Sequence, residues 1–248
     1  MEYITNINNV KILITMKRTR ILLMAIAAML SMGVVSCDKD DNSSVGDNGG
    51  YTTVEWVDLG LPSGLLWNSC NLGATTPEGY GNYYAWGETA TKEVYKWSTY
   101  RYCNGDYNQL TKYCNNSEYG YNGFTDSLIS LEAMDDAAAA LGDGAYMPSK
   151  AAWEELLNET TVKWTTINGV SGRKFTGPNG KTLFLPAAGY RWGSEILDAG
   201  SYSYYWSSSL YTGLPEYAWY FFFISDEQGM YYSGRRNDGF PIRPVRHK

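Results

Sequence analysis

Apolar and polar residues alternate over short stretches along most of the chain after residue 50, and this period of two predicts strands. Segments rich in glycine, asparagine and proline separate them and indicate turns. The expected strands cover residues 54–58, 65–70, 83–86, 162–167, 173–176, 182–185, 189–192, 204–209, 217–225, 230–233 and 241–245. Asn168-Gly169 and Asn179-Gly180 are typical of type I′ turns and predict two β-hairpins.

A helical period occurs only in the middle of the chain. Residues 131–141 contain an alanine run that ends before Gly142 and predict one helix. A second helix is expected over residues 150–158, with Ser149 as its N-cap and one apolar face in the core. Two helices between an N-terminal and a C-terminal group of strands predict an α+β fold, in which residues 88–126 form a loop-rich section.

The N-terminal segment has the pattern of an export signal. Three basic residues precede an apolar run at residues 21–30, and small residues then lead to Ser36-Cys37. This segment resembles a bacterial lipobox, in which Cys37 is lipidated and becomes the first mature residue. The run is shorter than the roughly 20 residues of a membrane span, and an uncleaved N-terminal anchor is the alternative. Either way, the rest of the chain is expected to work outside the cytoplasm.

The chain therefore divides into four expected segments. They are a mis-called extension at residues 1–15, a lipoprotein signal peptide at 16–36, a lipidated cysteine with a flexible tether at 37–50, and a folded ligand-binding domain at 51–248. The aspartates of the tether resemble the surface-export signal of Bacteroidetes lipoproteins, while an ordinary solvated linker is the alternative. The expected location is the outer membrane, with the domain exposed at the cell surface.

Charge and cysteine content narrow the possible partners. Residues 38–248 hold 16 basic and 25 acidic residues, and this net charge of −9 disfavours nucleic acid. The anchor on Cys37 is then the expected contact with the membrane.

Cys103 and Cys114 flank a polar segment in an oxidising compartment and predict a disulfide, which leaves Cys70 as a buried thiol. Metal binding is the weaker alternative, because the sole histidine, His247, lies beside the C-terminus.

Six sequence blocks connect the chain to a known family. They are VDLGLPSGLLW at residues 57–67, YAWGE at 84–88, YMPSKAAWEEL at 146–156, FLPAAGYR at 184–191, YWSSS at 205–209 and GFPIRPV at 239–245. Together they resemble the Fibrobacter succinogenes major paralogous domain and its Bacteroidetes lipoprotein relatives over residues 54–246. The resemblance implies a C-type-lectin-like fold of the formylglycine-generating-enzyme type, with two helices flanking a central antiparallel sheet.

The C-terminal blocks are also similar to the variable region of proteins diversified by retroelements, in which this fold holds a ligand-binding surface.

Catalysis is not expected. The cysteines that formylglycine-generating enzymes use late in the domain are missing after Cys114. The adjacent acids at 135–136 and 154–155 would not face one another on a helix. The Glu-Pro-Asn and Trp-Asn-Asp triplets of calcium-dependent lectins do not occur, and we expect neither a metal nor a cofactor.

Residues 190–240 contain 16 aromatic residues in 51 positions, which indicates a contact surface as well as a core. Alternation along residues 217–224 would bury Phe221 and Phe223 and place Tyr220 and Phe222 on the opposite face. The expected ligand-binding residues are Tyr211, Tyr217, Tyr220, Phe222, Tyr231, Arg235 and Asn237. In contrast, Trp67, Trp86, Trp153 and Trp206 are expected to be buried.

The sequence thus predicts a surface-exposed, lipid-anchored binding protein whose ligand is an unidentified protein or glycan. Two alternatives stay open. The aromatic residues could fill a second layer of core, or they could dock a neighbouring subunit in a structural or adhesin-like module of the cell envelope.

Overall fold

The computed structural model describes residues 55–248. The expected extension, signal peptide, lipidated Cys37 and tether (residues 1–15, 16–36 and 37–50) lie outside the described residues. Within the described range, no helix is long and apolar enough to cross a membrane.

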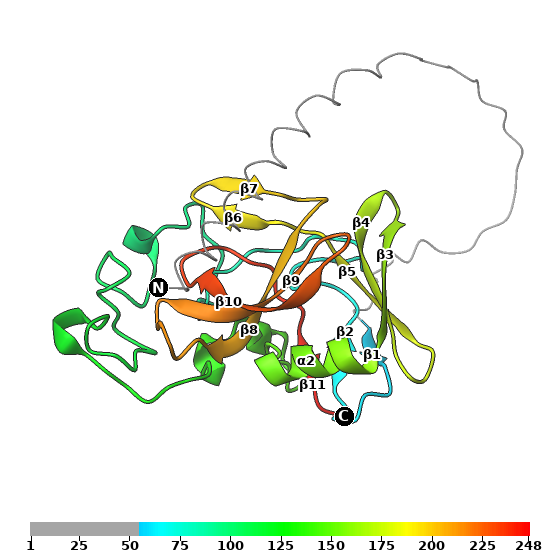
Figure 1. Cartoon of the computed structure of the whole chain (residues 1–248), viewed down its shortest axis with the longest axis horizontal. Coiled ribbons are helices and arrows are strands. Elements are labelled where there is room, and N and C mark those ends of the chain that lie inside the picture. The colour runs from blue at the N-terminus through cyan, green and yellow to red at the C-terminus, as the bar shows by residue number, and fades with distance from the viewer. Residues whose placement is uncertain (1–54) are drawn as a thin grey trace, which may run out of the picture. The chain divides into compact units, whose positions relative to one another are not determined.

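Antiparallel strands form most of the described regular structure (Figure 1). The strands are β1 (Trp56–Asp58), β2 (Leu66–Asn68), β3 (Thr161–Ile167), β4 (Val170–Thr176), β5 (Thr182–Pro186), β6 (Tyr190–Trp192), β7 (Glu195–Leu197), β8 (Ser203–Leu210), β9 (Tyr217–Phe223), β10 (Gln228–Arg235) and β11 (Val245–Arg246). The helix α2 (Lys150–Glu159) and several short 3₁₀ helices complete the set. The expected α+β, loop-rich class is therefore confirmed.

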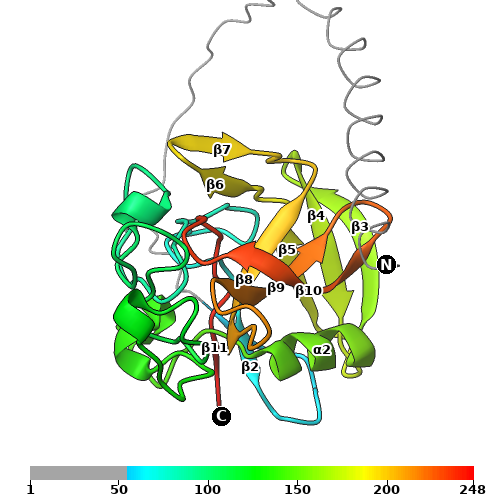
Figure 2. The ribbon, with the colours of Figure 1, turned by 60° about the vertical axis from the view of Figure 1, so that its left-hand side comes forward.

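The strands belong to small separate sheets. The strand orders are β10-β9-β8, β3-β4-β5, β1-β2-β11 and the β6-β7 hairpin, and all named pairs are antiparallel. The turned view shows the long loops of residues 88–148 on one side, next to the ends of β8, β9 and β10 (Figure 2). Helix α2 packs against β8, β9 and β10. This arrangement places the loop-rich section beside the aromatic strands.

Helix α2 begins where the sequence predicts it. The side chain of Ser149 accepts a hydrogen bond from the backbone N–H of Ala152 at 3.2 Å and caps the first turn. Ala152, Trp153 and Leu156 are buried, so the expected apolar face does lie in the core.

The other predicted helix, residues 131–141, is wrong. This segment forms two 3₁₀ helices, Ala133–Asp135 and Ala137–Leu141. Asp136 separates them with extended backbone angles, and its carboxylate accepts from the N–H groups of Ala138 and Met147 at 2.8 and 2.7 Å. An aspartate that bonds nearby N–H groups competes with helical hydrogen bonds, and this explains the break. One α-helix, not two, is therefore found among the described residues.

The hairpins and strand ends differ in part from the predictions. Asn168 and Gly169 both have positive φ angles, 48° and 83°, as the expected type I′ turn between β3 and β4 requires. The β4–β5 loop is longer, because Gly177 donates to Lys181 across it, and of the Asn179-Gly180 pair only Gly180 has a positive φ. Residues 83–86 form a single bridge, from Tyr84 to Phe240, instead of a strand. Residues 241–244 are also irregular, and β7 was not predicted.

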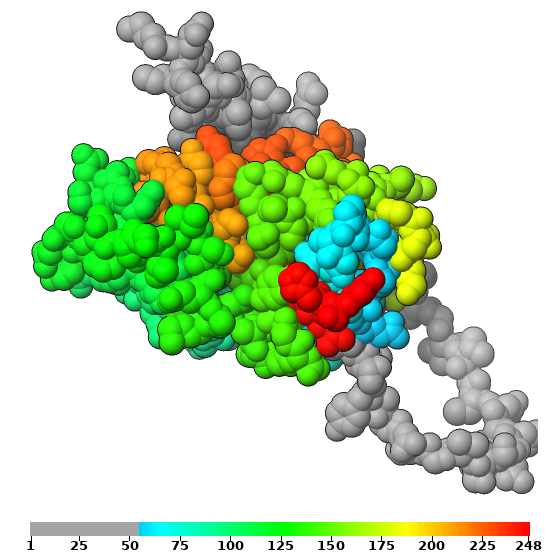
Figure 3. All heavy atoms as spheres, turned by 90° about the horizontal axis from the view of Figure 1, so that it is seen from below, coloured from blue at the N-terminus to red at the C-terminus, as the bar shows by residue number. Residues whose placement is uncertain are grey.

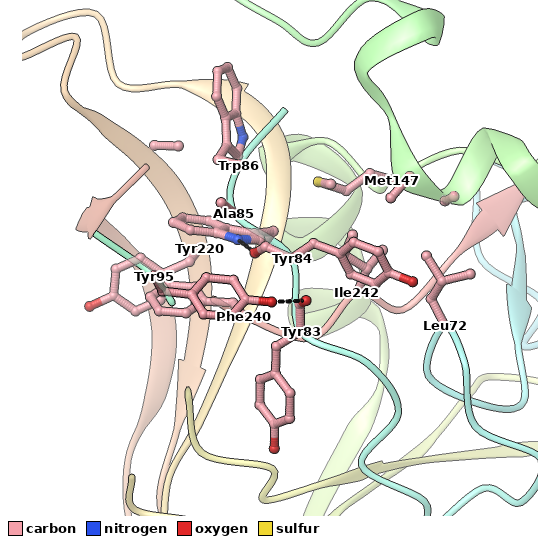
Figure 4. Close-up of a cluster of buried hydrophobic side chains, with 14 of the residues drawn as sticks. Leu72, Tyr83, Tyr84, Ala85, Trp86, Tyr95, Met147, Tyr220, Phe240 and Ile242 are labelled. Atoms are coloured by element: carbon pink, nitrogen blue, oxygen red, sulfur yellow. Dashed lines mark hydrogen bonds between the residues drawn. The ribbon is translucent and has the colours of Figure 1, made fainter. Parts of the chain in front are cut away.

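Two clusters of buried side chains make up the core. One lies around Trp206, whose ring stacks on Phe240 with centroids 4.0 Å apart, and Figure 4 shows part of it. The other lies between α2 and the facing side of β8 and β9, where Trp153 stacks on Phe221 at 4.9 Å. All four tryptophans that were expected to be buried, Trp67, Trp86, Trp153 and Trp206, are fully inaccessible. That prediction is confirmed.

Two arginines are also completely buried, and neither is paired with a carboxylate through a hydrogen bond. The guanidinium of Arg243 donates to Oδ1 of Asn71 at 2.9 Å and to the carbonyl oxygens of Asn68, Ser69 and Phe184. Asn68 ends β2 and Phe184 lies within β5, so Arg243 supplies buried donors to carbonyl oxygens of two different sheets. It thereby joins the segment after β2 to β5.

The predicted disulfide is not formed in the structure. Cys103 and Cys114 are free thiols, and so is the buried Cys70. The sulfur of Cys103 donates to the carbonyl of Trp97 at 3.1 Å, while that of Cys114 donates to Asn116 at 3.1 Å. Each thiol therefore has its own backbone partner. Burial raises the pKa of both thiols above the ordinary value of a cysteine.

Replacing Arg243 by glutamine should lower the free energy of unfolding by about 3–5 kcal/mol. The reason is that several buried oxygens lose their donor, and each unsatisfied group costs about 1–3 kcal/mol. Urea unfolding of the purified protein measures the change. The control is Arg235→Gln, since Arg235 is exposed and should change stability by no more than about 0.5 kcal/mol. Equal stability of the two variants would contradict this role of Arg243.

Candidate functional site

The seven residues expected to bind ligand do not form one patch, because the structure divides them among three places and the core. Tyr220, Phe222 and Tyr231 lie together on one face of the β10-β9-β8 sheet. The ring centroids of Phe222 and Tyr231 are 5.3 Å apart, and those of Tyr220 and Tyr231 are 6.1 Å apart. Tyr220 is buried, whereas Phe222 and Tyr231 are half-buried. This face is thus partly a second core layer.

Tyr211 lies with side chains of the opposite face. Its ring stacks on Tyr232 with centroids 4.4 Å apart and meets the edge of Trp219 at 5.5 Å. Trp219 alternates with Tyr220 along β9, so its side chain points to the α2 side, where the ammonium of Lys150 lies 4.7 Å from its ring. A bulge between Tyr231 and Gly234 changes the register of β10 here. The expectation of a single surface for Tyr211, Tyr220 and Tyr231 is therefore wrong.

Asn237 is not a surface residue either. Its side chain is only 4% exposed and donates to the carboxyl of Asp238 at 3.3 Å. The chain turns back into the core directly after β10, and this turn buries Asn237. The expectation that Asn237 contacts a ligand is corrected by its burial.

Tyr217 and Arg235 do come together, in a pocket. They are register partners on β9 and β10. With Trp97, Tyr107 and Glu216 they line a cavity of about 330 Å³. Trp97 belongs to a 3₁₀ helix (Trp97–Thr99) and Tyr107 to the following loop, so the loop-rich section supplies one wall. We call these five residues the Glu216 pocket. Ligand pockets in proteins begin at about this volume.

A further aromatic ring lies beside the pocket. Tyr107 also meets Tyr119, at a centroid distance of 6.4 Å. Burial raises the pKa of Tyr119, and the charge of Glu216 adds to the rise. In the space-filling view of Figure 3, the loop region in green and the strand segments in orange form one continuous surface. The pocket therefore lies where two parts of the chain distant in sequence meet.

Glu216 is unusual among the acids of the described residues. It is only 7% exposed, and its Oε2 atom has no hydrogen-bond partner. Burial raises the pKa of this carboxyl above the ordinary value of a glutamate, although the guanidinium of Arg236 opposes the shift. A buried acceptor without a donor costs about 1–3 kcal/mol. Such a group is expected where a ligand can supply the missing donor.

Arg236 fixes the backbone beneath the pocket. Its guanidinium donates to the carbonyl of Pro215 at 2.9 Å, next to Glu216, and its own N–H donates to the carbonyl of Glu216 at 3.1 Å. The same guanidinium lies 5.0 Å from the centre of the Trp86 ring. The side chain is completely buried, so it positions the pocket and does not line it.

The acids at positions 135, 154 and 155, which the sequence singles out, have partners within the protein. Asp135 accepts hydrogen bonds from the hydroxyls of Tyr102 and Tyr113 and from the ammonium of Lys112. Glu154 pairs with Lys150, and Glu155 accepts from the backbone N–H of Ser63 at 2.7 Å. These contacts give the acids structural roles. Among residues 55–248 no group of three or more His, Cys, Asp or Glu side chains is placed to hold a metal ion.

Sequence reasoning missed three residues of the pocket. Trp97 and Tyr107 lie in a polar, turn-rich section that has no strand face for large aromatic residues to cover. Aromatic residues in such a loop indicate a binding surface, so the sequence contained a signal for both. Glu216 gave no signal, because a single glutamate before a strand is ordinary. Its importance comes only from its burial and from the missing partner of Oε2.

Searches of protein-family models, of curated proteins and of solved structures found no match for this chain.

The pH dependence of stability should report Asp238, the buried acid after β10. Burial raises the pKa of its carboxyl from 3.8 to about 7, against the effect of Arg235. Between these values the folded state binds more protons than the unfolded state, so stability falls as pH rises and the loss is complete above pH 7. Asp238→Asn removes this loss, and the variant should exceed the wild type by up to roughly 4 kcal/mol at pH 8.

At pH 4 the same two proteins should differ little, because Asp238 is then protonated in the folded state. Urea unfolding at both pH values measures the difference. An Asp238→Asn variant that gains no stability between pH 4 and pH 8, relative to the wild type, would contradict the raised pKa.

Proposed function

We propose that this protein is a lipid-anchored binding protein of the outer membrane, exposed at the cell surface, and that it does not act as an enzyme. Its ligand is a protein or a glycan, bound at the end of the β10-β9-β8 sheet. The observation that carries the proposal is the Glu216 pocket, which combines three aromatic rings with an acceptor and a donor.

The composition of the pocket supports binding. Trp97, Tyr107 and Tyr217 offer broad apolar faces that lose little side-chain entropy on contact. Glu216 and Arg235 add a hydrogen-bond acceptor and a donor, as orientation-setting groups do in ligand pockets. Tyr217 and Arg235 were expected from the sequence as ligand-binding residues, and their meeting in one cavity supports that expectation.

The proposal also includes the family and its fold. The α+β class, the antiparallel β10-β9-β8 sheet with α2 on one side, and the long loops beside its ends support a C-type-lectin-like fold of the formylglycine-generating-enzyme type, although 3₁₀ helices replace the second of its two flanking helices. In that fold the long loop region exposes the last strands, which is where the Glu216 pocket lies. The six sequence blocks of the Fibrobacter succinogenes major paralogous domain supply the remaining support.

Truncation of Tyr217 should weaken binding without unfolding the domain. Glycan and peptide arrays identify the ligand, and calorimetry then compares its affinity for the wild type and for Tyr217→Ala. We expect a loss of about 1–3 kcal/mol, because half-buried tyrosines in contact surfaces commonly contribute this much.

The matched control is Tyr232→Ala. Tyr232 is 47% exposed, packs against Tyr211 and Trp219, and does not line the pocket. This variant should bind as the wild type does. Loss of affinity in Tyr232→Ala alone would instead move the contact surface to the Tyr211–Tyr232 pair.

Anchoring is tested separately at Cys37. The Cys37→Ala variant should stay unprocessed and take up no fatty acid in its host, because the lipobox sulfur is the atom to which the lipid is attached. Radiolabelled palmitate measures the incorporation. Wild-type protein that never becomes labelled would contradict the anchor, whatever the result at the pocket.

A further inference from the structure

The Glu216 pocket offers two unused polar groups of opposite kind. Oε2 of Glu216 is an acceptor without a donor. The guanidinium of Arg235 is exposed and makes no hydrogen bond or salt bridge with any described residue, although its charge also acts on the carboxyl of Asp238. A ligand that satisfies both groups must therefore donate on one side of the pocket and accept on the other.

A ligand group with a single charge would match only one of these two side chains. An ammonium group would meet Arg235, and it would also feel Arg236, whose charge reaches Glu216. A carboxylate or phosphate would pair with Arg235 but would face Glu216, whose oxygen it cannot supply with a donor. Hydroxyl groups avoid both conflicts, because each one carries no charge and both donates and accepts.

The aromatic walls define the shape of the group. Trp97, Tyr107 and Tyr217 line the pocket, and aromatic rings favour contact with flat or C–H-rich apolar surfaces. A pyranose ring has such C–H faces and carries hydroxyls around its edge. Few other biological groups combine an apolar face with several uncharged donor–acceptor groups at this size.

Resting on the function proposed above, we propose that the Glu216 pocket binds an uncharged saccharide ring. Glu216 accepts a hydrogen bond from one ring hydroxyl, Arg235 donates to the oxygen of another, and the ring stacks against the aromatic walls. Glu216 thereby determines the selectivity for neutral over charged sugars.

The experiment uses a glycan array that contains neutral, amino-sugar, uronic-acid and sulfated oligosaccharides, together with a peptide array. Wild-type protein should retain neutral glycans preferentially. Calorimetry with a neutral oligosaccharide from the array then compares the wild type with Glu216→Gln, in which the shape is kept while the carboxylate is lost. We expect about a tenfold loss of affinity, the size of one hydrogen bond to a charged group.

Arg235→Met provides a second variant that does not depend on the buried position. Arg235 is exposed, so at pH 5, where Asp238 is protonated in the folded state, this change should leave the unfolding midpoint unaltered and still lower the affinity several-fold. Tyr232→Ala again serves as the control with unchanged binding.

The possible results separate the two proposals. Preferential retention of anionic or cationic glycans, or a Glu216→Gln variant that is folded and binds neutral glycans as the wild type does, overturns the saccharide assignment. A peptide ligand whose binding depends on Tyr217 also overturns it but leaves the binding function intact. If neither array retains the protein, both proposals fail.

Discussion

The buried guanidinium of Arg236 is the interaction on which the loop-rich half of the domain depends. It donates to the carbonyls of Lys112, Tyr113 and Pro215 and to the hydroxyl of Tyr100, which belong to three segments distant in sequence. Residues 100–148 contain few ladder hydrogen bonds, so their buried carbonyls need donors from elsewhere. A single guanidinium meets this need because it presents five N–H groups in one plane. The loops therefore have a defined path although they contain almost no regular secondary structure.

The same contacts place the Glu216 pocket. Arg235 precedes Arg236 and lines the cavity, while Glu216 follows the Pro215 carbonyl that Arg236 holds. The Tyr113 carbonyl ties the loop section to this point, which brings the opposite wall within reach of β9 and β10. The pocket is thus formed by packing between a rigid sheet end and loops held to it, an arrangement often found at binding sites.

The sequence patterns predicted the features that depend on residues close in the chain. They failed for features that depend on contacts with residues distant in the chain. The Ser149 cap, the Asn168-Gly169 turn and the four buried tryptophans follow from short-range preference and hydrophobicity. The helix expected at residues 131–141 fails because Asp136 bonds the backbone of Met147, a contact that its own segment does not reveal. The period of two along β9 correctly predicted that Tyr220 and Phe222 lie on the face opposite to Phe221. It could not predict the bulge in β10 or the burial of Asn237, because these depend on the partner strand and on the core. The sequence therefore predicted only part of the pocket. Tyr217 and Arg235 lie on strands and were expected, whereas Trp97 and Tyr107 come from the loops and were not.

Arg236 also explains why Glu216 keeps an unused oxygen. An acid and a guanidinium buried near one another would ordinarily form an ion pair, because removing either charge from water is costly. Here the guanidinium donates four hydrogen bonds to Tyr100, Tyr113, Pro215 and Lys112, which leaves little capacity for Glu216. Its charge still moderates the rise in the pKa of the Glu216 carboxyl, which favours the acceptor form without occupying it. The buried Arg236 therefore holds the loops in place and also leaves an acceptor of Glu216 available at the pocket.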